Sequence, residues 1–213
     1  MDSNVKWCNE MTIERTIKAL EKNNMNGYYI NSRDELIEKI NSLINEGDMI
    51  TVGGSATLNE TGILELLRSG KYNFLDRYKE GLSGEEIGEI FRKAFFCDAY
   101  FTSTNALTEN GELYNVDGNG NRVAAMLFGP KKVIVICGVN KIVKNIEEAV
   151  ERNKRCSAPM NAKRLNKPTP CAKVGYCMDC SSSGRICNEY TVIKRQSNKE
   201  RIHVLILNEA LGY

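Results

Sequence analysis

The sequence predicts an α/β fold with a mostly parallel sheet and helices on both faces. Short apolar runs rich in β-branched residues alternate along the chain with amphipathic segments of helical period, and this alternation is typical of parallel sheets. Polar, glycine-rich turns follow several of the apolar runs, which is where open α/β sheets bind ligands. The chain has 213 residues, of which 42% are hydrophobic, and this length suits one or two domains with a substantial core.

Helices are expected where apolar residues recur at helical spacing, often behind a capping signal. The sequences at 32–35 and 57–60 have the pattern of a capping box, and 83–86 caps the next helix. Short apolar runs between the helices predict strands. In chain order we expect a helix over 5–23, a strand over 28–30, a helix after 32–35, a strand over 49–52, a helix over 57–67, a short strand over 72–75 and a helix after 83–86.

The stretch 98–141 carries most of the polar turns. A strand over 99–102 leads into a polar turn at 103–105, and Asn110-Gly111 is a hairpin signal. The turn 117–122 opens a short apolar segment at 123–128. A strand over 133–137 follows, and then a charged helix over 142–154.

The last part of the chain differs from the rest in composition. From Ser157 onward, prolines and cysteines predict a long irregular segment, and a loop of that length needs something to hold it in place. Strands over 190–194 and 202–207 close the chain. The expected division is residues 1–155 as the α/β domain and 156–213 as a Cys-rich loop with two closing strands, packed on the same domain.

Composition argues against several classes of function. The net charge is +2, with 29 basic and 27 acidic residues interspersed, which gives no reason to expect nucleic acid as a partner. No apolar run is long enough to span a membrane, and the polar N-terminal helix does not resemble a signal peptide. The expected location is cytoplasmic, where eight cysteines do not form a disulfide framework.

Polar and glycine residues at the predicted strand ends form the expected ligand site. A glycine turn before a helix lets backbone amides approach an anion, and a guanidinium clamps a carboxylate or phosphate at two points. A purely structural interpretation is also open. The glycines suit an ordinary tight turn, and Lys141 suits the cap of the helix that follows it. The site residues are Gly53, Gly54, Ser55, Ser103, Thr104, Asn105, Asp117, Arg122, Asn140 and Lys141.

No residue is identified as catalytic. Glu60 reads as the capping partner of Thr57, and Glu109 lies beside a hairpin turn where solvent reaches it. His203 is the single histidine and lies among apolar neighbours, so it reads as structural. With one histidine, the sequence supplies no Ser/His or Cys/His arrangement for nucleophilic catalysis.

A metal centre is expected at Cys171, Cys177, Cys180 and Cys187, which have the spacing C-x5-C-x2-C-x6-C. The C-x2-C pair places two thiolates on one ion, and two further cysteines complete the four sulfurs that zinc or an iron–sulfur cluster takes. The missing second C-x2-C pair favours iron–sulfur over zinc. Four free thiols, or two disulfides formed on oxidation, remain the alternative.

Three separated motifs resemble one known family. They are TVGGSATLNETGI at 51–63, TSTNALTENGELYNVDGNGNRVAAMLFGPKKVIVICGVNKIV at 102–143 and TPCAKVGYCMDCSSSGRICN at 169–188. These motifs resemble the LUD domain of LutC/YkgG-type lactate-utilisation proteins, and the third resembles a cysteine-bearing branch common in anaerobic bacteria. The resemblance implies a sheet fold related to ribose-5-phosphate isomerase, CoA transferases and 5-formyltetrahydrofolate cyclo-ligase.

The resemblance and the site residues together give the functional hypotheses. The first is a LutC-like protein that binds a small anionic metabolite and carries an Fe–S cluster in 2-hydroxy-acid oxidation, with redox proteins as partners and a homodimer as its assembly. The second is a metabolite-binding or regulatory module with structural zinc. A CoA- or phosphosugar-handling enzyme is a third, which rests on fold analogy alone.

Overall fold

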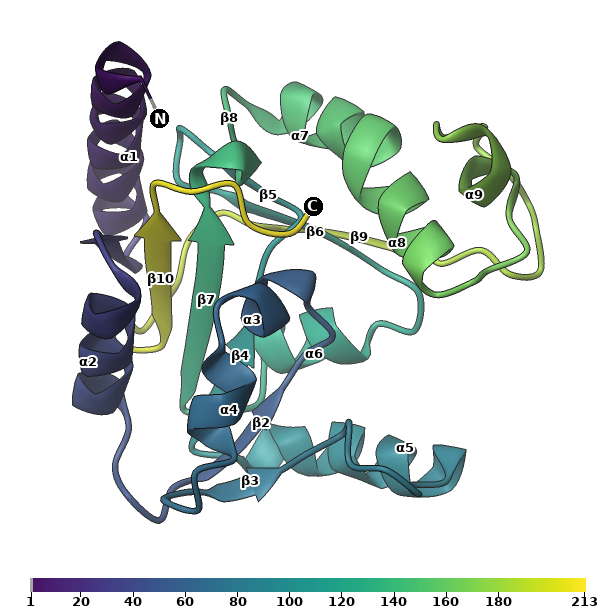
Figure 1. The fold of residues 1–213 in the computed structure, drawn as a ribbon, viewed down its shortest axis with the longest axis horizontal. Helices are drawn as coiled ribbons and strands as arrows, with labels where there is room; N and C mark the ends of the chain where they lie inside the picture. Colours follow the sequence, from purple (N-terminus) through teal and green to yellow (C-terminus); the bar gives the residue numbers. More distant parts are fainter. Residues whose placement is uncertain (1) are drawn as a thin grey trace.

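The computed structural model describes residues 2–213 and is built on a six-stranded parallel sheet (Figure 1). Its spatial order is β1 (Asn26–Ile30), β10 (Ile202–Leu207), β7 (Lys132–Gly138), β4 (Ala99–Thr102), β2 (Met49–Val52) and β3 (Asn73–Leu75). Every neighbouring pair in this sheet is parallel. The predicted α/β fold with a mostly parallel sheet is confirmed.

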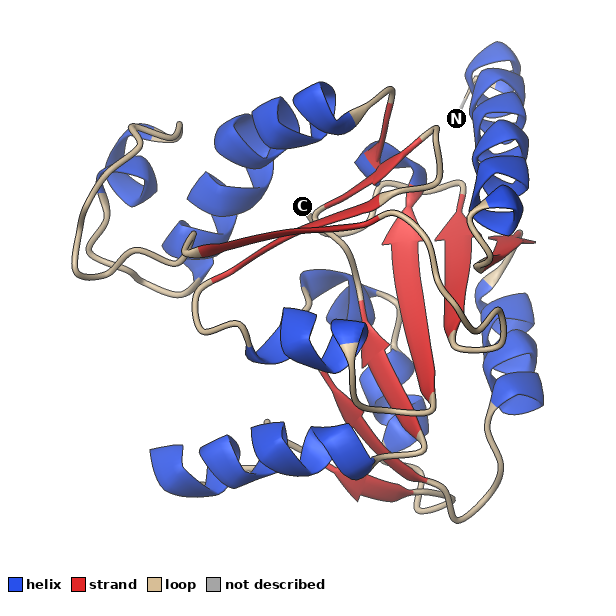
Figure 2. Ribbon diagram, turned by 180° about the vertical axis from the view of Figure 1, so that it is seen from behind, coloured by secondary structure: helices blue, strands red, loops and turns tan. Residues whose placement is uncertain are grey.

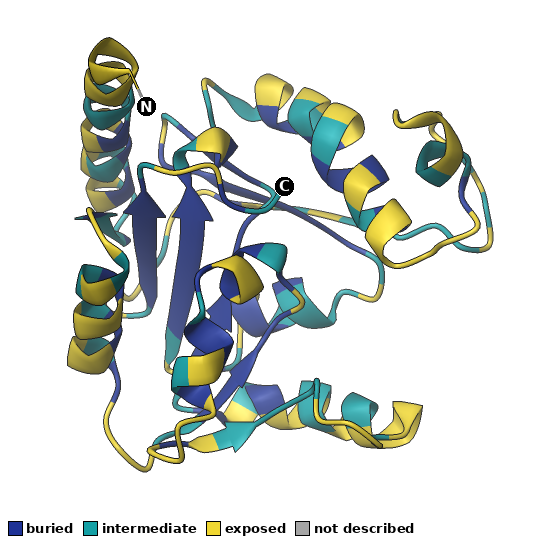
Figure 3. Cartoon of the chain, in the orientation of Figure 1, coloured by how far each residue is buried: buried dark blue, intermediate teal, exposed yellow. Residues whose placement is uncertain are grey.

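Helices cover both faces of this sheet. The helices of this part are α1 (Ser3–Lys22), α2 (Arg33–Leu43), α3 (Ala56–Glu60), α4 (Ile63–Leu67), α5 (Gly84–Lys93), the short 3₁₀ helix η1 (Ala94–Phe96) and α6 (Asn121–Leu127). Alternate residues of β7 point to opposite faces of the sheet. Ile134 and Ile136 pack with α2, α3 and α4 on one face. Val133 and Val135 pack with α1 and α6 on the other. Strands β7 and β10 are therefore buried along almost their whole length (Figure 3).

A second, four-stranded sheet lies beside the first, with the order β8 (Ile142–Val143), β5 (Ala106–Thr108), β6 (Leu113–Asp117) and β9 (Glu189–Ile193) (Figure 2). Strands β5 and β6 form the predicted antiparallel hairpin around Asn110-Gly111. Their residues Leu107 and Leu113 enter the core shared with α1. The strand expected over 190–194 is β9, but its pairing with the hairpin in a second sheet was not predicted. Strand β8 has two residues and is too short to have a strand pattern.

Between Val139 and Val174 the structure differs from two of the predictions. A 3₁₀ turn, η2 (Val139–Lys141), and β8 come first, so the helix expected over 142–154 begins only at α7 (Ile146–Arg152). A π-helix, η3 (Asn153–Ser157), then continues into α8 (Ala158–Arg164), and α9 (Pro170–Val174) follows. The segment from Ser157 was expected to be irregular, but Pro159 and Pro170 lie in the first turn of these helices, where proline is tolerated.

Two smaller corrections concern residues 57–67 and 123–128. The helix expected over 57–67 is divided at Gly62, whose φ is 72°, into α3 and α4. The apolar segment after the turn at 117–122 is the helix α6. Among residues 2–213 no helix is long and apolar enough to cross a membrane.

Gly111 is the residue of the hairpin turn on which the contact with α1 depends. Its φ is 74°, and a Cβ there would lie 2.6 Å from the carbonyl carbon of Ala19 in α1. Gly47 has a similar φ of 85° but nothing within 4 Å of the position a Cβ would take. We expect Gly111→Ala to lower the free energy of unfolding by about 2–3 kcal/mol and Gly47→Ala by about 1 kcal/mol.

Denaturant melts of the two variants, compared with the wild type, check this. The shared left-handed backbone makes Gly47→Ala the control for strain, so the difference between the variants measures the contact with α1. Equal losses in the two variants would mean that the hairpin does not press against the backbone of α1.

Candidate functional site

The carboxyl ends of the parallel strands meet at one cleft of about 590 Å³. The turns after β2, β4 and β7 all reach it, as expected for an open α/β sheet. The second sheet and the segment around α8 form its other walls, and the C-terminal residue Tyr213 also lines it. Of the residues predicted for the site, the structure places Gly54, Ser55, Ser103, Thr104, Asn105, Asp117, Arg122 and Lys141 in the lining.

Gly53 and Asn140 lie next to the cleft and do not line it. A Cβ on Gly53 would lie 2.8 Å from the hydroxyl oxygen of Tyr100, so this glycine allows close packing behind the turn. The side chain of Asn140 holds the C-terminal tail instead: its Oδ1 accepts from the amide of Leu211 at 3.0 Å and its Nδ2 donates to the carbonyl oxygen of Gly212 at 3.2 Å.

Arg122 occupies the wall of the cleft, but its donors are already bonded within the protein. Nε donates to Asp117 Oδ1 at 2.9 Å, and Nη1 donates to the carbonyl of Ser103 at 3.0 Å and to Asn115 Oδ1 at 2.6 Å. Nη2 donates to Asn105 Oδ1 at 2.8 Å and to the carbonyl of Val116 at 3.2 Å. Because a guanidinium has five N–H groups, none is left for an anion, and the geometry favours a positioning role over the expected two-point clamp.

Asp117 is the other half of this arrangement. Its carboxylate lies 2.7 Å from Arg122 Nη2, and both side chains are nearly buried, at 7% and 12% exposed. Asp117 Oδ2 also accepts from the backbone amides of Arg122 and Val123, which fixes the start of α6. The pair therefore joins β6, the turn after β4 and α6 into one rigid wall.

Lys141 reaches the cleft from the turn after β7 and is only 3% exposed. Its Nζ lies 2.9 Å from Thr57 Oγ1 and 3.0 Å from Ser103 Oγ. Among residues 2–213 no carboxylate forms an ion pair with it. Burial first of all, and then the neighbouring guanidinium groups of Arg152 and Arg122, lower the pKa of Lys141 to about 7.

Arg77 is a cleft residue that was not predicted from the sequence. It follows β3, lines the cleft and stacks on Phe91, with its guanidinium carbon 4.5 Å from the ring centre. A Cβ on Gly54 would lie 3.6 Å from Arg77 Nη1, so the cation faces the glycine turn. Its Nε is buried without a hydrogen bond, and it forms no ion pair within the described residues. The same strand-end rule that selected Gly54 selects Arg77, once 72–75 is taken as a strand.

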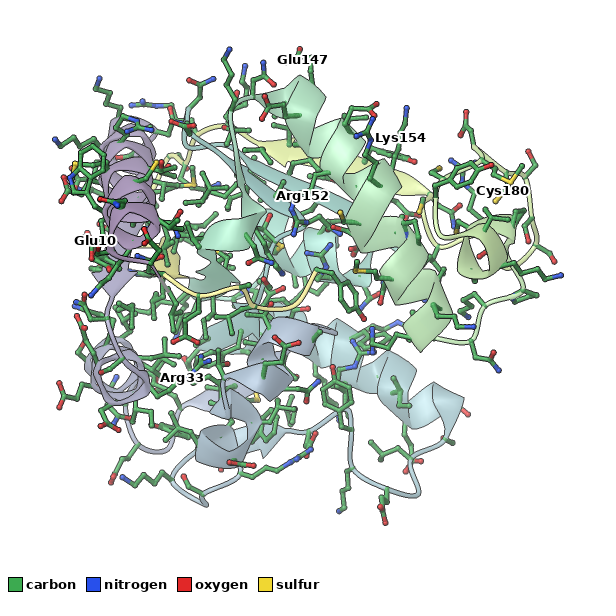
Figure 4. All side chains as sticks on the ribbon, turned by 45° about the horizontal axis from the view of Figure 1, so that its top comes forward. Glu10, Arg33, Glu147, Arg152, Lys154 and Cys180 are labelled. Carbon is green, nitrogen blue, oxygen red and sulfur yellow. The ribbon has the colours of Figure 1, made fainter. Side chains whose placement is uncertain are left out.

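Arg152, which is labelled in Figure 4, is the last residue of α7 and is bonded to the turn that carries Lys141. Its guanidinium donates to the carbonyl oxygens of Asn105 at 2.7 Å and Asn140 at 3.0 Å, and to Ser157 Oγ at 2.7 Å. Burial lowers the pKa of Arg152. The charge nevertheless adds to the positive potential around Lys141.

The three residues considered for acid–base roles lie outside the cleft lining. Glu60 does not complete a capping box with Thr57: the cap of α3 is Ser55, and Glu60 Oε2 accepts from the amide of Gly212 at 2.7 Å. Glu109 pairs with Arg15 at 3.0 Å. His203 is buried in β10, where it stacks on Tyr28, and burial lowers its pKa.

The four cysteines of the predicted metal centre line one cavity of about 20 Å³. Figure 4 labels Cys180, which lies beyond α9. All four are free thiols, and burial, followed by the charges of Cys177 and Cys171, raises the pKa of Cys187 to about 11. Among residues 2–213, no three histidine, cysteine, aspartate or glutamate side chains are grouped so as to hold a metal ion. The sulfurs therefore face a common space without closing on it.

The cysteine cavity and the cleft share a wall. Arg185 and Ile186 line both. Asn188 anchors this wall to the cleft, because its amide donates to the carbonyl of Asp117 at 2.8 Å and its Nδ2 to that of Gly118 at 2.9 Å. The order of the cysteine segment and the shape of the cleft are thus linked.

The family model of the LUD domain matches residues 13–207. The crystal structure of a DUF162 family protein from Deinococcus radiodurans is similar in fold, with a TM-score of 0.53 and 14% identity over 93% of this chain and 98% of that one. Ribose 5-phosphate isomerase from Plasmodium falciparum aligns over 53% of this chain and 52% of its own, with a TM-score of 0.33 and 17% identity. No curated protein is similar to the chain in sequence.

Proposed function

Because the chain belongs to the LUD domain family, which is associated with lactate utilisation, we propose that it binds a small organic anion of that metabolism in the cleft. The ligand class is a 2-hydroxy or 2-oxo acid, such as lactate or pyruvate. In this proposal the chain is a LutC-like component of 2-hydroxy-acid oxidation.

The observation that carries the proposal is a pair of cations without carboxylate partners. Arg77 and Lys141 both line the cleft, and neither forms an ion pair within residues 2–213. Buried or half-buried charges are normally paired, because desolvation is costly. A carboxylate bound in the same cleft supplies the missing negative charge.

A second candidate follows from the size of the cleft. Its 590 Å³ is more than lactate fills, and Arg164 and Lys167 add cations to its lining. A phosphosugar or a CoA ester would use those cations for its phosphates. Binding measured side by side with lactate, pyruvate, a sugar phosphate and a CoA ester separates the two candidates.

We further propose that Cys171, Cys177, Cys180 and Cys187 hold an iron–sulfur cluster, with structural zinc as the alternative. The proposal is supported by the donor type, since four thiols line a single cavity and none is used in a disulfide. The thiols would have to move closer together to bind one metal centre. A cluster supplies one-electron transfer when bound, whereas zinc supplies only order to the segment. Arg185 donates to the carbonyl oxygens of Cys180 and Cys187 and so holds the loop around that cavity.

Replacement of Arg77 tests the anion site. We expect Arg77→Gln to weaken binding of lactate or pyruvate by about 10- to 100-fold, since a hydrogen bond to a charged group contributes about 1.5–3 kcal/mol. Isothermal titration calorimetry at physiological ionic strength measures this. The matched control is Arg92→Gln, because Arg92 is an exposed arginine of α5 that pairs with Glu89. Equal affinities in both variants would remove Arg77 from the site.

A further inference from the structure

Lys141 differs from a lysine that only provides charge. The ammonium of Lys131, for comparison, is exposed and pairs with Asp98 at 2.8 Å. The Nζ of Lys141 is buried and has two hydroxyl partners, Thr57 and Ser103. Hydroxyls stabilise an ammonium less than a carboxylate does, and they also bond to a neutral amine. The site is therefore suited to an amine that loses its proton.

The surrounding charges act in the same direction. Arg152 and Arg122 face Lys141 from α7 and α6, and both disfavour its charged form. Cys137 of β7 and Glu60 of α3 favour the charged form, but Glu60 is occupied by the amide of Gly212. Burial is the largest effect. A lysine that is desolvated beside other cations is the kind that proteins use as a nucleophile toward carbonyl groups.

We propose that Lys141 is a catalytic residue that forms a Schiff base with the carbonyl carbon of an anionic aldehyde or ketone, with a 2-oxo acid as the first candidate. This inference rests on the proposed anion site and adds to it a covalent step. Arg77 faces the glycine turn and lines the same cleft as Lys141. In this proposal Arg77 holds the carboxylate and the amine of Lys141 attacks the adjacent carbonyl carbon.

The step balances without an oxidant or reductant. The lone pair of Nζ attacks the carbonyl carbon, a C–N bond forms, and the π electrons move to the carbonyl oxygen, which takes a proton to give a carbinolamine. Loss of that hydroxyl as water, with the proton from nitrogen, gives the imine. Thr57 Oγ1 donates to the carbonyl of Leu211, so the hydroxyl of Ser103 is the one placed to carry protons between nitrogen and oxygen.

Reductive trapping tests the proposal. The protein is incubated with pyruvate and sodium cyanoborohydride, and the product is mapped by peptide mass spectrometry. We expect one reduced pyruvate adduct at Lys141 and little at Lys167, an exposed lysine of the same cleft that serves as the internal control. Trapping should increase as the pH rises through about 7, because the neutral amine is the nucleophile. Lys141→Arg should retain the charge and lose the adduct.

The outcomes separate this inference from the proposed function. If the wild-type protein binds lactate by calorimetry but gives no adduct at Lys141 with pyruvate, the Schiff-base proposal is wrong and the proposed anion site stands. Adducts spread evenly over surface lysines would overturn it as well. A protein that binds neither lactate nor pyruvate would instead count against the anion site. Since mapping is done on the wild type, the test does not depend on a variant that folds.

Discussion

Replacing Arg122 with alanine is expected to lower the free energy of unfolding by about 3–5 kcal/mol, the cost of removing one partner of a buried ion pair. The variant leaves Asp117 buried at 7% exposure with its charge partner gone. It also removes the guanidinium donor of Asn115 Oδ1. Asn105 Oδ1 keeps the amide of Val116 as a donor, and the carbonyl of Ser103 keeps the hydroxyl of Thr102. For a chain of this size the loss corresponds to a fall in melting temperature of roughly 10 °C.

Thermal and denaturant melts measure this loss, and the surface pair of Arg15 and Glu109 provides the control. Arg15→Ala removes an arginine whose side chain is 57% exposed, so it should cost less than about 1 kcal/mol. An Arg122→Ala protein that melts like the wild type but fails to bind lactate would contradict the positioning role. It would restore the two-point clamp that the sequence alone suggested.

Substitution of the paired cysteines is expected to abolish metal binding. Protein purified without oxygen should contain iron and sulfide and absorb visible light, whereas Cys177→Ser and Cys180→Ser should be colourless, because each loses one of the four proposed thiolate ligands. Their segment should also become more susceptible to proteolysis, since the bound group contributes folding energy that its few buried apolar residues cannot supply.

Cys8→Ser is the control for this experiment, because Cys8 is exposed on α1 and outside the cluster. It should keep its iron and its colour. Stoichiometric zinc without iron in the wild type would retain the site and remove the redox role. A wild-type protein that is folded, colourless and free of metal would contradict the metal centre itself.

The fold was predictable where local pattern and tertiary structure agree. The strands over 49–52 and 99–102 lie at the predicted residues, because each is a short apolar run bounded by polar turns. The hairpin at Asn110-Gly111 follows from turn chemistry alone. The sequence pattern does not predict which strands pair when they are far apart in the chain. Strand β10, the last in the chain, lies between β1 and β7 in the sheet. The strand order is fixed by packing, not by local sequence.

The site was predictable to the same degree. Residues that follow parallel strands do meet at one cleft, as the strand-end rule requires. The rule does not say which donors are already used within the protein, so it could not distinguish Arg122, whose donors are bonded, from Arg77, whose Nε has no hydrogen bond. Nor could it show that Lys141 is buried between hydroxyls, because its partners come from turns far apart in the sequence.

Titration of the isotope-labelled protein with pyruvate and lactate, followed through its backbone amide resonances, is the sharpest test of the proposed anion site. We expect saturable shifts that cluster at Gly54, Ser55 and the turn 103–105, with the side-chain resonances of Arg77 moving in parallel. Saturable shifts confined to a surface away from these turns, or no shifts with either acid, would contradict it.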